Sequence, residues 1–120
     1  MPTPFDAPVF PIDCEGREVF RHLTGRWGML IVVVLGSGPA RFYELRDRIG
    51  GISEKMLAQT LRALNRDGLV RRDATATIPP QVTYALTPLG YQFHSPLAEL
   101  LQRINENLAA VQSARSDFDK

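Results

Sequence analysis

The sequence predicts a mainly α-helical domain with one small β-hairpin, an α+β fold. Three observations lead to this prediction. Apolar residues recur at helical spacing along most of the chain, glycine and proline divide it into short segments, and one stretch alternates with the period of a strand. The chain has 120 residues, of which 44% are hydrophobic. A chain of this size can bury one core without a disulfide or a metal ion.

The chain is expected to begin with an extended arm, because residues 1–13 contain four prolines. A first helix follows over about 14–24, and Gly25 ends it. Its apolar stripe consists of Val19, Phe20 and Leu23.

Two further segments precede the middle of the chain. Residues 27–35 have no polar face, so periodicity alone fits a buried strand as well as a buried helix. After the Gly-Ser-Gly-Pro break at 36–39, residues 42–49 form a short amphipathic helix that ends at two glycines.

A longer helix is predicted from Ser53, its N-cap, to about Asp67. Strands over 69–72 and 82–86 follow, and a proline-containing turn joins them into a hairpin. These elements follow one another in the order of a winged helix-turn-helix. In that fold the second helix enters the major groove, and the hairpin lies over the DNA backbone or minor groove.

The last helix is predicted to start at Thr87-Pro88, and Pro96 should kink or restart it. Beyond Pro96 the apolar residues are spaced as in a coiled-coil seam, at Leu97, Leu101, Ile104, Leu108 and Val111. The seam fits a dimer, and it also fits packing on the first helix of the same chain. Residues 14–112 are therefore expected to form one domain, followed by a polar tail over 113–120.

The helix from Ser53 has the two faces that DNA reading requires. At 100° per residue, its three leucines at 57, 61 and 64 cluster on one side, and its donors lie on the other. Gln can bond adenine and Arg can bond guanine in a bidentate way. The expected DNA-binding residues are Ser53, Lys55, Gln59, Arg62 and Arg66 on this helix, with Arg71 and Arg72 on the hairpin.

Charge is segregated along the chain although its net value is only +1. Between residues 21 and 72, ten basic residues face four acidic ones, whereas both ends of the chain are net acidic. A basic middle favours a polyanion such as double-stranded DNA, because the local field governs association. A solvated arginine-rich helix face would show the same pattern.

Several motifs resemble, in order, those of the HxlR-type winged-helix transcriptional regulators of the MarR-like superfamily. They are Gly25-Arg26-Trp27, Gly38 to Leu45, Gly51 to Leu57, Leu61 to Leu64, Asp67 to Val70, and Pro79 to Thr87 with Leu89-Gly90. The resemblance covers roughly residues 14–108 and implies that 27–35 is a helix. Thr83 departs from the pattern, because the family often has an acid there.

The resemblance also implies a homodimer that binds palindromic operator DNA, with dimer contacts from the first and last helices. The corresponding residues here are Val19, Phe20, Leu97, Leu101, Ile104 and Leu108. Some members of the family sense quinones, aldehydes or hypochlorite through a cysteine in the position of Cys14. A helix N-terminus and Arg17 favour the Cys14 thiolate, whereas Asp13 and Glu15 oppose it. An unreactive Cys14 is the alternative.

No enzyme signature is present in the sequence. His22 and His94 are isolated in the sequence, and one cysteine cannot make a zinc site, so no metal is expected. There is also no P-loop or nucleophile elbow, so no cofactor or catalytic residue is expected. The longest apolar run, at 29–35, is too short to span a membrane, and no basic leader precedes Arg17. A cytoplasmic bacterial or archaeal regulator is therefore expected. The alternative is a winged-helix module that binds protein and not DNA.

Overall fold

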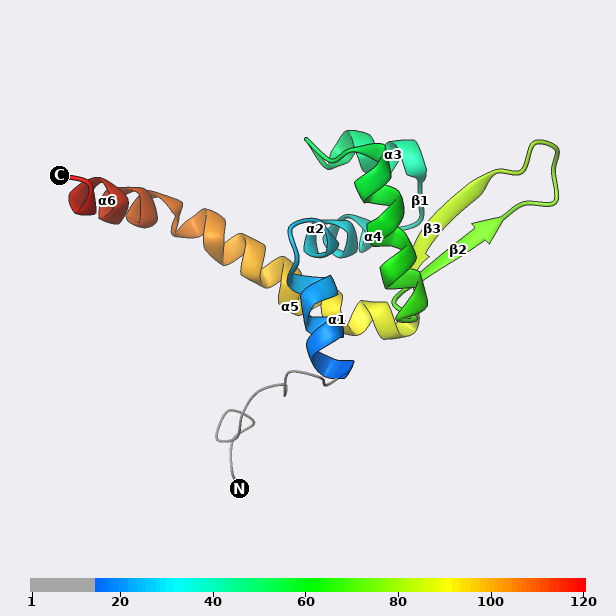
Figure 1. The fold of residues 1–120 in the computed structure, drawn as a ribbon, viewed down its shortest axis with the longest axis horizontal. Coiled ribbons are helices and arrows are strands. Elements are labelled where there is room, and N and C mark those ends of the chain that lie inside the picture. The colour runs from blue at the N-terminus through cyan, green and yellow to red at the C-terminus, as the bar shows by residue number, and fades with distance from the viewer. Residues whose placement is uncertain (1–14) are drawn as a thin grey trace, which may run out of the picture.

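The computed structural model describes residues 15–120, which form a group of helices with a small sheet at one side (Figure 1). The elements in chain order are α1 (Glu15–Thr24), α2 (Gly28–Leu35), β1 (Ala40–Arg41), α3 (Phe42–Arg48), α4 (Glu54–Arg66), β2 (Val70–Ala74), β3 (Val82–Leu86), α5 (Pro88–Glu106) and α6 (Leu108–Phe118). This confirms the predicted α+β fold. The expected arm over 1–13 lies outside the described residues.

Helix α2 forms the centre of the core. Its residues Ile31, Val32 and Leu35 are completely buried, and α1, α4, α5 and β3 all contact the helix. Because neighbours surround it, a helix without a polar face is stable here in spite of its β-branched residues. The structure thus decides between the two alternatives for 27–35 in favour of the helix.

The sheet has three antiparallel strands in the order β1-β3-β2. The two hairpin strands pair from Val70 with Leu86 to Ala74 with Val82. The two-residue strand β1 was not expected from the sequence. It pairs with β3 through Ala40 opposite Tyr84 and Arg41 opposite Thr83, so α3, which starts at the next residue, begins beside β3.

The C-terminal helices differ from the expectation at two points. Helix α5 continues through Pro96 and does not restart there, and the break comes at Asn107, whose backbone leaves the helical region. The stretch expected as a polar tail, 113–120, is helical as far as Phe118.

The second half of α5 and all of α6 project from the body of the molecule (Figure 1). The described chain measures 59 × 39 × 23 Å, and its radius of gyration is 17.2 Å. A compact chain of this length would have a radius of about 14 Å. No residue of α6 is buried, although Leu108 and Val111 are apolar. The projecting helices therefore expose an apolar stripe that residues 15–120 do not cover.

Candidate nucleic-acid interface

Helix α4 is held at both ends by local interactions. The Ser53 hydroxyl accepts a hydrogen bond from the backbone N–H of Met56 at 3.0 Å, which confirms Ser53 as the N-cap. Gly68, with a φ of +77°, stops the helix in a conformation that favours glycine. The helix therefore presents a fixed surface to its surroundings.

The two faces of α4 lie as its sequence predicts. Leu57, Leu61 and Leu64 are buried in the core. The four expected donors of the helix, Lys55, Gln59, Arg62 and Arg66, are exposed. Exposed donors along one face of a helix can bond base edges and phosphates, so α4 has the surface of a recognition helix.

An ion pair positions α4 against α3. Arg46 Nη1 lies 2.6 Å from Glu54 Oε1 at the start of α4, and the guanidinium stacks over the Tyr43 ring at 4.7 Å. The hydrogen bond that Arg46 donates to the Glu54 carboxylate raises the pKa of Arg46 above its ordinary value, and nearby Asp47 adds to the effect. Between the helices, Gly51 makes the turn with a φ of +86°. Together these contacts set the angle at which α4 leaves the body.

The wing, β2–loop–β3, stands beside α4 (Figure 1). Arg62 and Arg72 line one shallow cleft between α4 and the wing, with Tyr84 in its wall. Arg71 is exposed, and its Nε donates to Asp73 Oδ2 at 2.7 Å. The tip of the wing, residues 75–81, contains no Lys or Arg, and Ile78 there is almost completely exposed. The positive charge of the wing therefore lies at its base.

Helix α1 clamps the C-terminal end of α4, which sequence reasoning missed. His22 Nδ1 lies 2.5 Å from Asp67 Oδ2 at the C-cap of α4, and Glu18 Oε1 lies 3.2 Å from Arg66 Nη1. These partners are 45 and 48 residues apart, so no local pattern announces them. Arg66, an expected DNA contact, is thus partly engaged by Glu18 while its side chain stays 76% exposed.

The expected dimer residues divide into two groups. Leu97 is buried in the core and Val19 packs against it, so both contribute to the fold of a single chain. Phe20, Ile104 and Leu108 are each between 43% and 50% exposed, and Leu101 is half-buried. Leu100 and Val111 extend the exposed group. The candidate sensor, Cys14, lies outside the described residues.

Within residues 15–120, no three His, Cys, Asp or Glu side chains are grouped so that they could hold a metal ion. Among the described helices, none combines the length and the apolarity needed to cross a membrane.

The comparisons with known proteins agree with this geometry. Residues 22–112 match the HxlR-like helix-turn-helix family. The chain belongs to this family. An uncharacterized HTH-type transcriptional regulator of Escherichia coli, YtfH, is 49% identical over 112 residues, which cover 93% of this chain and 89% of YtfH. The HTH-type transcriptional regulator YodB of Bacillus subtilis is 38% identical over 70% of this chain and 75% of its own length.

Solved structures of HxlR-like and related winged-helix regulators superpose on the chain. The transcriptional regulator ytfH from Salmonella typhimurium has a TM-score of 0.85 and 46% identity, over 92% of this chain and 99% of that one. The redox regulator HypR in its oxidized form has a TM-score of 0.72 and 28% identity. The match covers 78% of this chain and 97% of the HypR chain. The HxlR-like chain described here is thus a winged-helix, DNA-binding transcriptional regulator and not an enzyme.

Proposed function

We propose that this HxlR-like regulator binds a palindromic operator as a homodimer and reads one half-site with each α4. The observation that supports this most directly is the row of exposed donors on α4, beside the arginines at the base of the wing. In such a dimer the two recognition helices lie about 34 Å apart, or a multiple of that turn length.

The exposed stripe on α5 and α6 supports the dimer. Ile104, Leu108 and Val111 together expose an apolar surface that the described residues, 15–120, leave in water. A second copy offers the same stripe, and a two-fold axis pairs identical surfaces. Phe20 on α1 is exposed as well and supplies the expected contact from the first helix.

The reading surface is tested by single substitutions on α4. Arg62→Ala or Gln59→Ala should each weaken operator binding by about 1–3 kcal/mol and relax base preference at one position, because a bidentate base contact is lost. The operator is first selected from random duplexes, and affinities are then measured by fluorescence anisotropy. Arg103→Ala, at an exposed position on α5 outside the basic segment, serves as the matched control and should bind as wild type does.

A wing substitution distinguishes backbone contacts from base contacts. Arg71→Ala should weaken all duplexes alike and lower the log–log salt slope by about 1, because one phosphate contact is lost. If these α4 and wing variants all bind like wild type, the proposed reading surface is wrong. If the wild type binds no duplex above its nonspecific level, the alternative of a protein-binding winged-helix module is favoured.

We also propose that Cys14 makes the regulator responsive to oxidants or electrophiles. The names of two similar structures support this, namely the redox regulator HypR and diamide-treated YodB. With one cysteine per chain, oxidation by diamide joins Cys14 either to the Cys14 of a second subunit or to a small thiol. Two thiols form an S–S bond, and their two electrons and two protons reduce the N=N bond to a hydrazine. With a quinone, the sulfur adds to a ring carbon.

Modification of Cys14 should change operator affinity in the wild type and leave Cys14→Ser unaffected. The measurement is a dose response of DNA binding to diamide and to benzoquinone. Identical dose responses in the two proteins would remove Cys14 from the mechanism.

The proposed activity also implies a location. A transcriptional regulator acts where the chromosome lies, and the similar regulators come from bacteria and from the archaeon Methanothermobacter thermautotrophicus. We therefore propose a cytoplasmic site of action in a bacterial or archaeal cell.

A further inference from the structure

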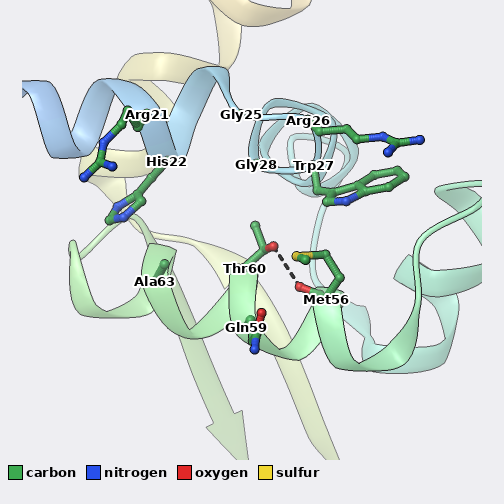
Figure 2. A pocket seen from close by; sticks show the side chains of 10 residues that line it. All are labelled: Arg21, His22, Gly25, Arg26, Trp27, Gly28, Met56, Gln59, Thr60 and Ala63. Atoms are coloured by element: carbon green, nitrogen blue, oxygen red, sulfur yellow. Dashed lines mark hydrogen bonds between the residues drawn. The ribbon is translucent and has the colours of Figure 1, made fainter.

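Exposed arginines lie on both sides of the recognition helix α4. On the wing side, Arg62 and Arg72 line the shallow cleft between α4 and the hairpin. On the other side, Arg21 and Arg26 line a second cleft, between α4 and the segment that joins α1 to α2 (Figure 2). All four side chains are exposed, and within residues 15–120 none of them forms an ion pair. Only the wing-side pair was expected from the sequence to contact DNA.

The two pairs flank the reading face from opposite sides. At about 100° per residue, Ala58 and Asn65 of the wing-side cleft lie across the helix from Met56 and Ala63 of the other cleft. Gln59 lies between them, on the face that the core leaves exposed. A DNA major groove is about 12 Å wide, and each of its two borders is the phosphate chain of a different strand. With α4 in the groove, each arginine pair therefore lies toward one border.

Arg26 lies beside the end at which α4 begins. Figure 2 shows it on the side of Met56, in the first turn of α4, whereas Arg21 lies toward the other end. The Arg26 guanidinium stacks over the Trp27 ring at 4.7 Å, and this ring reaches the turn before α4, 4.0 Å from where a Cβ on Gly51 would lie. The N-terminal residues of a recognition helix are those that contact base edges. A stacked, planar guanidinium at this end has less freedom to lose when it binds a phosphate through two N–H groups.

We propose that Arg26 binds a DNA phosphate on the strand opposite to the one that Arg72 contacts at the base of the wing. The two contacts hold α4 in the major groove from both sides. Contacts to phosphates fix the register and orientation of a protein on the duplex without reading its sequence. Arg26 therefore sets where the donors of α4 lie, and those donors read the bases. This contact depends on the DNA-reading function of α4 that is proposed above.

Substitutions at Arg26 test the phosphate contact. Arg26→Gln should weaken binding to the operator and to its single-base variants by the same factor, about tenfold for each half-site, because one phosphate is no longer neutralised. The log–log salt slope should fall by about 1 for each half-site. Arg26→Lys keeps the charge and should keep the slope. Arg103→Gln removes one exposed charge on α5 and should match wild type in affinity and slope.

Neutral methylphosphonates locate the contacted phosphate and its strand. They replace single phosphates of the operator, one position at a time along each strand. In wild type, a replacement weakens binding wherever a cation of the protein contacts that phosphate. One such position in each half-site should lose its effect in Arg26→Gln, and a different one in Arg72→Gln. The two positions should lie on opposite strands, across one major groove.

Wild-type affinity and slope in Arg26→Gln, or a loss that varies with the base sequence, would overturn the contact. So would the absence of a position that loses its effect in this variant. Two positions on one strand, or none for Arg72→Gln, would overturn the two-sided arrangement. Thermal unfolding shows whether each variant is folded.

The variants of the reading face separate this contact from the function on which it depends. If Arg62→Ala and Gln59→Ala bind like wild type as well, the reading function proposed above is wrong. If those two variants weaken binding as expected and Arg26→Gln does not, only the contact at Arg26 is wrong.

Discussion

Replacement of Ile104 and Leu108 with glutamate is expected to convert the protein to monomers and to abolish tight operator binding. The two side chains lie one turn apart on the exposed stripe, on either side of the break at Asn107. Buried in a dimer interface, each added carboxylate would lose its hydration without gaining a partner. In a dimer the second half-site is bound intramolecularly, which raises the affinity for a full operator far above that for one half-site. A monomer loses this gain, so affinity for a full operator should fall by about a hundredfold or more.

Two measurements test this dimer prediction. Analytical ultracentrifugation gives the oligomeric state, and anisotropy gives the affinity for the full operator and for one half-site. Gln102→Glu with Asn105→Glu adds the same two charges off the stripe and should remain dimeric. A double variant at 104 and 108 that stays dimeric would show that the interface lies elsewhere on the chain.

Gly28→Ala is expected to destabilise the fold by about 2–3 kcal/mol, which corresponds to roughly 10 °C in Tm. Gly28 begins α2 where that helix passes close to the end of α1. A Cβ at this position would lie 1.8 Å from the His22 carbonyl oxygen, which is backbone and cannot rotate away. The two helices would have to separate, and buried contacts of the core would be lost.

Gly50→Ala is the matched control for this prediction. A Cβ at Gly50 meets nothing within 4 Å, so the substitution should change stability by no more than about 0.5 kcal/mol. Urea unfolding followed by circular dichroism compares the two variants with wild type. If Gly28→Ala matches Gly50→Ala, the close crossing of α1 and α2 does not limit stability.

Local patterns were sufficient to predict the recognition helix. Its cap depends on the hydroxyl of Ser53, its end on Gly68, and its inner face on three leucines, and each of these signals lies within one or two turns of the residue that it affects. The four outward donors follow from the same periodicity. This part of the site could therefore be predicted from the sequence.

Features that depend on tertiary contacts could not be predicted in this way. The β-branched run in α2 gave no periodicity, and only the family resemblance favoured a helix. The clamp between His22 and Asp67 joins residues 45 positions apart, so no spacing rule detects it. Pro96 was expected to kink or restart the last helix, yet α5 does not restart there and ends at Asn107.

The uncharged tip of the wing has a consequence for the choice of operator. Because residues 75–81 hold no Lys or Arg, the tip gains nothing from the strong negative potential of a narrow A·T-rich minor groove. Any preference of the wing tip for flanking base pairs would depend on how easily those base steps unstack to admit an aliphatic side chain such as Ile78. Flexible pyrimidine–purine steps would then be favoured at the outer edges of the operator, and this preference would persist in concentrated salt.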